Sequence, residues 1–413
     1  MNGPKRGIES SSCGETGRRL RPWSAPALCA ALLAPSIAPA QLALTTAAVI
    51  EHQESSNIFD LSPGAAPATA NGDTQRSDSF TAYGGSLTST YGWGRQNLTF
   101  IIDGHEYRYE HFTGLDHDEY KVSGDWEWQA GSIFDGTIGV TRNRQMVAFS
   151  SFVGTALSVQ TNQVEHASMN IRVMPEWRIE TGASSSNSDS PRPGMPNLSL
   201  REDTGTAALR YTGYAGLSTG ISGRYTDGSY SGADTTLEPS YHESAAQVVA
   251  TYSLNPTSNF DFAAGYTRRQ STVAFDRNSG FTGLVSYQRH LTGKTSFKLQ
   301  LSRSINSYIT NTGSEIDSAA TFTLSWQATH KIAVSSSYSY TYSELPRQGL
   351  NNADRLDHFR IAQLNFDYRP RNWLELQPYA RWETRTSDTP GAPYSASVYG
   401  ISATVRWQNE GRR

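Results

Sequence analysis

Tight turns divide this sequence at nearly even intervals. Eight short segments with turn-forming composition centre on residues 93, 130, 175, 213, 256, 293, 330 and 371. The intervals between these centres are 37 to 45 residues long. Such an interval holds two strands of ~10 to 14 residues, one tight turn and one longer loop. The chain is therefore predicted to be a series of hairpins.

Apolar residues alternate with polar or small residues on both sides of these turns. Phe260, Phe262, Ala264 and Tyr266 form one such series, and residues 320–328 and 332–342 form another pair around a turn at 329–331. A period of two is the signature of a strand whose two faces meet different surroundings. The longer segments between hairpins are polar, and the clearest are 184–203, 227–241, 344–356 and 386–395. We expect these segments to be loops.

Eight hairpins give 16 strands, and two more strands are expected at the ends. One is predicted within 42–58, and residues 399–407 read as a closing strand. The predicted fold is all-β, a transmembrane antiparallel up-and-down β-barrel of about 18 strands, with 16 as the alternative. Tight turns would face the periplasm and longer loops the outside. Closure satisfies every backbone hydrogen bond in lipid, so a polar chain can span a membrane in this way.

The composition fits a barrel better than a soluble fold. Hydrophobic residues make up 37% of the chain, yet it has 21 Tyr, 15 Phe and 9 Trp, which argues against global disorder. The alternative is a secreted β-sandwich or a string of small β domains. A sandwich needs a dry core between two sheets, whereas here the face opposite the apolar one is charged or small.

The first 40 residues have the order of a secretory signal. Five positive charges precede an apolar stretch from Ala25 to Ala34, and Ala38-Pro39-Ala40 resembles a cleavage site. Both cysteines, Cys13 and Cys29, lie in this segment. We therefore predict a signal peptide at 1–40, an N-terminal strand and linker at 41–78 and a barrel at 79–413. The mature chain would carry 30 positive against 36 negative charges, which does not favour nucleic acid as a partner.

The alternation assigns side chains to two faces. One parity is apolar and is predicted to face lipid; its members include Leu98, Phe100, Val122, Ile179, Val248, Phe262, Val285, Leu299, Leu301, Leu324, Leu364, Phe366, Leu376, Ile401 and Val405. Aromatic residues of the same parity near strand ends are predicted to form interfacial girdles: Trp126, Trp128, Trp177, Tyr225, Tyr252, Tyr287, Trp326, Tyr338, Tyr368, Trp382 and Trp407. Outer-membrane lipid is thus an expected partner.

The opposite parity is predicted to line the lumen. Its charged members are Asp103, Lys121, Asp125, Glu127, Arg178, Glu180, Arg224, Asp261, Lys298, Asp367, Glu375, Arg381 and Arg406. Both signs occur together, which suits a polar solute better than strict selection of one ion sign. The other interpretation is that these charges pair across strands and only hold the wall together.

No motif predicts an enzyme or a cofactor. Gly216-Leu217-Ser218-Thr219-Gly220 has the letters of a nucleophile elbow, but it leads into a strand rather than a helix. His and carboxylate residues are dense between 105 and 119, and the weak metal candidates there are His111, Asp116, His117 and Asp118. A solvated acidic loop is the favoured interpretation, so no metal and no catalytic residue is predicted.

Short aromatic motifs in the first half of the chain resemble a known family. They are Glu54-Ser55-Ser56-Asn57-Ile58-Phe59, Arg76-Ser77-Asp78, Tyr107-Arg108-Tyr109, Phe112, Leu115, Tyr120, Trp126-Glu127-Trp128 and Pro175-Glu176-Trp177-Arg178. Their order resembles the EpsL family of exopolysaccharide-biosynthesis outer-membrane barrels, within the putative β-barrel porin group. The resemblance implies an outer-membrane location, polysaccharide and other exopolysaccharide-secretion components as partners, and no catalytic residues.

The resulting expectation is a conduit for export or assembly of a secreted exopolysaccharide. The alternatives are a general diffusion porin for small polar solutes and a structural or adhesive surface barrel with a plugged lumen.

Overall fold

The computed structural model describes residues 41–67, 72, 74–151, 154–191, 197–214, 216–232, 240–271, 278–307, 314–345 and 354–409. The predicted signal segment, 1–40, lies outside this description, as do both cysteines. No helix among the described residues is long and apolar enough to cross a bilayer. The described part of the unit Ala38–Arg413 is almost wholly β-strand.

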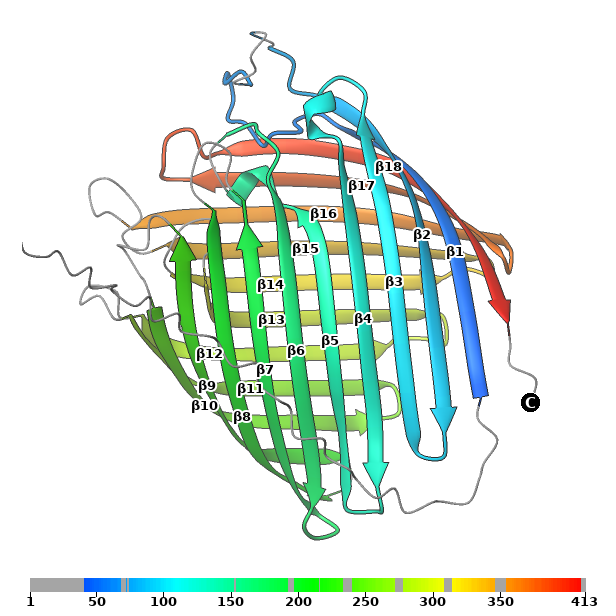
Figure 1. The fold of residues 1–413 in the computed structure, drawn as a ribbon, viewed down its shortest axis with the longest axis vertical. Helices are drawn as coiled ribbons and strands as arrows, with labels where there is room; N and C mark the ends of the chain where they lie inside the picture. The colour runs from blue at the N-terminus through cyan, green and yellow to red at the C-terminus, as the bar shows by residue number, and fades with distance from the viewer. Residues whose placement is uncertain are drawn as a thin grey trace, which may run out of the picture. The chain divides into compact units, whose positions relative to one another are not determined.

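Eighteen strands and two short 3₁₀ turns make up this unit (Figure 1). The 3₁₀ turns are η1 (Thr113–Leu115) and η2 (Phe149–Ser151). The strands are β1 (Gln41–Ser55), β2 (Asp78–Trp93), β3 (Gln96–Tyr109), β4 (His117–Ala130), β5 (Phe134–Met146), β6 (Val159–Arg172), β7 (Trp177–Ser190), β8 (Leu198–Tyr214), β9 (Leu217–Gly232), β10 (Ser240–Asn255), β11 (Ser258–Ser271), β12 (Ser279–His290), β13 (Thr295–Ser307), β14 (Ser314–Gln327), β15 (Ile332–Leu345), β16 (Arg355–Arg371), β17 (Leu374–Ser387) and β18 (Tyr394–Asn409).

The sheet is closed into a barrel by its first and last strands. Each strand pairs antiparallel with its neighbour in sequence, and β1 pairs on one side with β2 and on the other with β18. The closing ladder runs from Leu44 opposite Asn409 to Ser55 opposite Val398. The strand expected within 42–58 is therefore β1, one of the strands of the barrel wall. Closure leaves no strand edge without a partner, and the predicted count of 18 is confirmed.

The short turns lie at one mouth of the barrel and the longer connections at the other. All eight predicted turns join consecutive strands, from 94–95 between β2 and β3 to 372–373 between β16 and β17. Gly94 and Gly131 have φ of 59° and 65° in the first two turns, a conformation that glycine adopts at little cost. In Figure 1 these turns lie to the lower right, and the connections such as 56–77 and 147–158 lie to the upper left.

Two of the four predicted loops are largely strand. Residues expected to form the loop 184–203 continue the ladder, with Ser184 opposite Thr204 and Ser190 opposite Leu198. The predicted loop 227–241 likewise contains the ends of β9 and β10, with Asp227 opposite His242. At the end of β7 both faces are polar, so no apolar alternation marked it, whereas the loop-side ends of β8, β9 and β10 carry a buried cluster that the sequence analysis missed: Leu198, Leu200, Tyr230 and Tyr241. The other two predicted loops agree with the gaps after β15 and after β17 within two residues.

The ladder registers separate an outer from an inner face. Tyr91, Leu98, Trp126 and Ile138 lie side by side on consecutive strands, and each is at least one-third exposed. Because strand side chains alternate, the intervening residues point inward. The inner face is identified by contacts across the concave wall, such as the Tyr379 hydroxyl that donates to Glu51 Oε1, two strands away, at 2.6 Å.

The main buried apolar cluster lies at the loop mouth rather than in the middle of the barrel. It combines Phe59 from the β1–β2 loop, Phe80 on β2, Phe112 and Leu115 beside η1, and Phe149 in η2. The Phe59 ring contacts Phe112 and Phe149 edge-on, with centroids 4.7 and 5.0 Å apart. These rings hold three loops together over one sector of the barrel.

Candidate functional site in the barrel lumen

The inner wall carries all thirteen charged residues that were predicted to line the lumen. Asp103 and Lys121 are direct cross-strand neighbours on β3 and β4, and Asp125 and Glu127 follow on β4. The others have the same inward parity on their strands: Arg178, Glu180, Arg224, Asp261, Lys298, Asp367, Glu375, Arg381 and Arg406. Their role in conduction stays a prediction.

Many of these charges are paired within the wall. Glu180 forms an ion pair with Arg178, at 2.7 Å, and accepts a hydrogen bond from Arg210 Nε, at 2.8 Å. Glu375, which is buried, lies between Arg369 and Arg406 at 2.8 and 2.7 Å. Such networks fix charges of both signs in place along a water-facing wall.

Other lumen charges have freer surroundings. Among the described residues, Lys121, Asp261 and Lys298 form no ion pair within 4.0 Å, while Asp125 approaches His166 Nε2 at 3.4 Å. Asp367 accepts a hydrogen bond from Gln377 at 2.6 Å. These side chains are available to a passing solute, so the wall is not fully self-neutralised.

A hydroxyl-lined sector of the wall was missed by the sequence reasoning. On β15 the inward residues are Ser335, Ser337, Ser339, Thr341 and Ser343, and each faces an inward partner on β14. The alternation of Ser or Thr with Tyr through 337–343 was a signal for this sector. Only charged residues had been sought on the inner face, so it was overlooked.

The loops at one mouth fold toward the axis of the barrel over β1–β5 and β16–β18. Asp78 holds the β3–β4 loop by accepting the backbone N–H groups of His111 and Phe112 at 3.0 and 2.9 Å. Asn57 in the β1–β2 loop donates from Nδ2 to the carbonyl oxygens of Leu61 and Ser395. These side chains form hydrogen bonds with backbone N–H and C=O groups of the loops that would otherwise lack a partner within the protein.

Ser150 in η2 is held from both sides. Its backbone N–H donates to Asp60 Oδ2 at 3.1 Å, and its carbonyl oxygen accepts from Arg385 Nη1 on β17 at 2.8 Å. Arg385 also pairs with buried Asp357 at 2.6 Å and lies over the Phe359 ring. The β5–β6 loop therefore reaches the opposite part of the wall and narrows this mouth.

A cavity of about 410 Å³ lies beneath these loops. Its walls include Tyr107, Tyr109, Tyr394, Glu119, Arg381 and Glu383, and Asp60 borders it from the loop side. Burial and the nearby Glu383 raise the pKa of Asp60 to about 7. The site thus combines aromatic rings with charges of both signs in partly desolvated surroundings.

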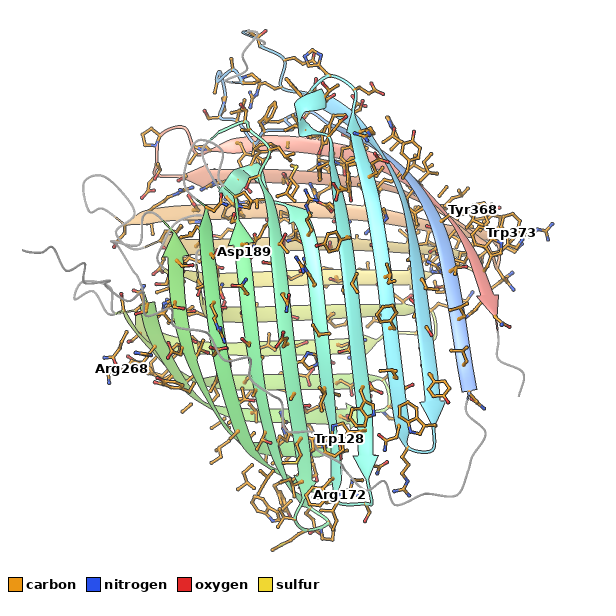
Figure 2. The ribbon with its side chains drawn as sticks, viewed as in Figure 1. Trp128, Arg172, Asp189, Arg268, Tyr368 and Trp373 are labelled. Carbon is orange, nitrogen blue, oxygen red and sulfur yellow. The ribbon has the colours of Figure 1, made fainter. Side chains whose placement is uncertain are left out.

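The predicted girdle residues all belong to the outer face, but their positions along the strands differ. Eight lie near the short-turn mouth: Trp126, Trp128, Trp177, Tyr252, Tyr287, Trp326, Tyr368 and Trp407. Figure 2 shows Trp128 and Tyr368 at this end and Asp189 toward the other. Tyr225, Tyr338 and Trp382 lie near the middle of their strands instead. Strands such as β9 continue past the apolar belt as a polar ladder, so a strand end and a belt edge need not coincide.

The weak metal candidates are engaged in other contacts. Asp116 accepts from Arg108 and from the backbone N–H of Tyr109, Asp118 pairs with Arg144, and the His117 ring stacks on Tyr107. His111 lies edge-on against Phe112. In the described part of the chain, no group of three or more His, Cys, Asp or Glu residues could hold a metal ion. For these residues the sequence analysis favoured a solvated acidic loop over a metal site.

Fold, outer belt and polar lumen together define the class. A closed antiparallel barrel with an exposed apolar band and a polar interior is a β-barrel of the bacterial outer membrane. Gly216-Leu217-Ser218-Thr219-Gly220 belongs to the turn and strand β9, so it does not form the strand-to-helix elbow of a hydrolase.

Comparison with known proteins gives structural matches only. No family model matches this chain, and no curated protein does. The solved structure of *Pseudomonas aeruginosa* OpdK with vanillate has a TM-score of 0.49 and 10% identity, covering 88% of this chain and 99% of that one. *P. aeruginosa* OccK2 (OpdF) in complex with glucuronate gives 0.48 and 11%, covering 89% and 98%. *P. aeruginosa* OccK5 (OpdH) gives 0.47 and 11%, covering 90% and 98%.

The expectation of an exopolysaccharide conduit is wrong. The solved structures that resemble this chain include the Occ and Opd proteins and two siderophore receptors, and none of these is an exopolysaccharide exporter. The fold supplies a physical reason as well. The β5–β6 loop enters one mouth, where Arg385 on β17 holds the Ser150 carbonyl oxygen at 2.8 Å, and a polymer would have to pass this loop. The resemblance to the EpsL family stays a prediction.

Proposed function

We propose that this protein is a diffusion channel for small polar solutes, the function first considered as the alternative. The observation that carries the proposal is the closed barrel with a polar inner wall of fixed charges and hydroxyl groups. Water and small solutes can exchange hydration for contacts with such a wall, and mixed charges retard neither ion sign completely. The outer belt would contact outer-membrane lipid, and no catalytic role is assigned.

The inward-folded loops support a size limit. The hydrogen bonds of Ser150 with Asp60 and Arg385 hold the β5–β6 loop across part of the mouth. We therefore expect the passage of solutes to be limited there rather than in the middle of the barrel. Charged residues that remain unpaired, such as Lys121 and Lys298, would set a moderate preference among ions.

The test is the conductance of the purified full chain in a planar bilayer. The proposal predicts stepwise current increases at low voltage, with permeability to both cations and anions. A bilayer that stays silent after demonstrated insertion of heat-modifiable, folded protein would refute it. That outcome would instead favour the structural or adhesive barrel with a plugged lumen.

A further inference from the structure

The cavity beneath the inward-folded loops has an aromatic lining. Tyr107 and Tyr109 come from β3, Tyr394 from β18 and Phe359 from β16, and Phe149 closes it from the β5–β6 loop. Its volume of about 410 Å³ falls in the usual range for small-ligand pockets, about 300–1,000 Å³. Electron-rich ring faces in such a space favour an organic cation.

Acidic groups outnumber basic ones around this space. Glu119 approaches His117 Nε2 at 3.3 Å and accepts the Met146 backbone N–H at 2.7 Å. Glu383 pairs with Arg381 at 3.4 Å. The remaining carboxylate, Asp60, forms no ion pair among the described residues, since Arg385 is committed to Ser150 and Asp357.

Asp60 is fixed by its backbone as well as by its hydrogen bond. It is the only non-glycine residue with positive φ, at 52°, in the described part of the chain. This conformation is one that Asp and Asn tolerate better than most residues. Its carboxylate meets the Ser150 N–H with one oxygen. No basic side chain of the described residues lies within ion-pair distance of this carboxylate, and Arg381, the arginine in the cavity wall, pairs with Glu383 at 3.4 Å.

We propose that this cavity binds a small organic cation with an apolar body, whose ammonium group lies beside Asp60 and whose body contacts the tyrosine and phenylalanine rings. The inference rests on the proposed function, since the lumen is the route by which such a solute arrives. Burial and the nearby Glu383 raise the pKa of Asp60 to about 7, and this carboxylate has no ion-pair partner of its own among the described residues. A bound cation would supply one.

The probe is benzyltrimethylammonium, titrated by calorimetry into the full chain in detergent at pH 8. Benzyl alcohol and benzoate serve as the neutral and anionic comparisons. The proposal predicts binding of the cation with at least tenfold preference over both comparisons. Equal affinity for benzyl alcohol, or tighter binding of benzoate, would overturn it.

Asp60→Asn removes the charge while its amide carbonyl still accepts the Ser150 N–H. We expect this variant to weaken binding of the cation by about tenfold or more, while binding of benzyl alcohol stays the same. Asp189→Asn, on the outer face near the loop mouth (Figure 2), makes the same change in net charge and should leave the affinity unaltered. Equal loss in both variants, or no loss in Asp60→Asn, contradicts the proposal.

A second variant tests the rings independently. Tyr394→Leu keeps the bulk of the wall but removes one aromatic face, and we expect several-fold weaker binding of the cation with little change for benzyl alcohol. An unchanged affinity for the cation would contradict the aromatic part of the proposal. Binding in detergent is independent of conductance, so a silent channel that binds the cation refutes the proposed function alone.

The affinity for the cation should also decrease as the pH is lowered. The groups facing Asp60 are Arg381 and Glu383 on β17, Tyr394 on β18 and the backbone of Ser150, with His117 and Glu119 across the cavity. Protonation of Asp60 removes its attraction for a cation, so binding should weaken between pH 8 and pH 5.5. Asp60→Asn should lose most of that dependence; a variant that keeps all of it would assign the titration to another group and overturn the role of Asp60.

Discussion

Arg385 on β17 donates a hydrogen bond from Nη1 to the backbone carbonyl oxygen of Ser150, 2.8 Å away, although the two residues are 235 positions apart in sequence. The same guanidinium pairs with Asp357 and covers the Phe359 ring. One buried cation thus joins the wall of the barrel to a loop that enters its mouth. This contact explains how an 18-stranded barrel can be wide and still restrict passage at one end.

Replacing Arg385 should widen this mouth. Arg385→Gln removes a charged hydrogen bond worth about 1.5–3 kcal/mol to the inward position of the loop. Asp357 would keep its second partner, Arg355, at 3.0 Å, so the barrel should still fold. We expect a larger single-channel conductance in planar bilayers. Arg268→Gln on the outer face is the matched control (Figure 2). Equal conductance in the two variants would show that the contact between Arg385 and Ser150 does not limit the passage of ions.

An added charge should destabilise the barrel much more at one residue of β13 than at its neighbour. Leu301 is outward and 45% exposed, whereas Gln300 is inward. Leu301→Arg places a charge in the apolar belt and should cost about 2–4 kcal/mol of folding free energy in lipid vesicles. Gln300→Arg should cost less than about 1 kcal/mol, because the lumen is wet. The measurement is urea-dependent folding into vesicles, and similar costs at both positions would contradict the assignment of the two faces.

The inner wall should influence ion preference through its unpaired charges. Lys298→Glu changes two units of charge in the lumen, so the permeability ratio should move toward cations. The reversal potential under a KCl gradient measures this ratio. Arg289→Glu near the short-turn end of β12 makes an equal change on the opposite face and should have little effect. A shift in the control as large as in Lys298→Glu would argue against a conducting lumen.

The inward position of the β5–β6 loop should depend on pH. Because the pKa of Asp60 in the folded protein, about 7, exceeds its ordinary value of 3.8, the protonated form is favoured there. The free energy that protonated Asp60 contributes to loop closure is therefore largest at low pH, and it is lost as the pH rises to about 7. Hydrogen exchange at Phe149–Ser151, corrected for intrinsic rates, should be slower at pH 5.5 than at pH 8.

The Asn variant supplies the control for this effect. In Asp60→Asn the exchange rate of the same segment, corrected in the same way, should be nearly independent of pH. Full retention of the pH dependence would mean that a group other than Asp60 controls closure.

The strand order and the two faces were predictable because they follow from local patterns. Alternation around residues such as Phe262 and Leu324, with turns near 256 and 330, fixes both parity and hairpin order. The end of β7 was not predictable in this way, since residues 184–190 are polar on both faces and gave no alternation.

The mouth was beyond sequence reasoning for a different reason. The contact of Ser150 with Arg385 and Asp60 joins three segments far apart in sequence, and each reads singly as an ordinary loop or strand residue. The predicted polymer conduit failed at this point, because strand alternation carries no information on whether loops fold inward.

Size-dependent uptake tests the central claim most directly. Liposomes that contain the full chain should swell rapidly in isosmotic arabinose or glucose, more slowly in disaccharides, and hardly at all in larger oligosaccharides. Arg385→Gln should extend this cutoff upward. Swelling no faster than in protein-free liposomes for every sugar, with the protein shown to be inserted and folded, would contradict the account of a small-solute channel.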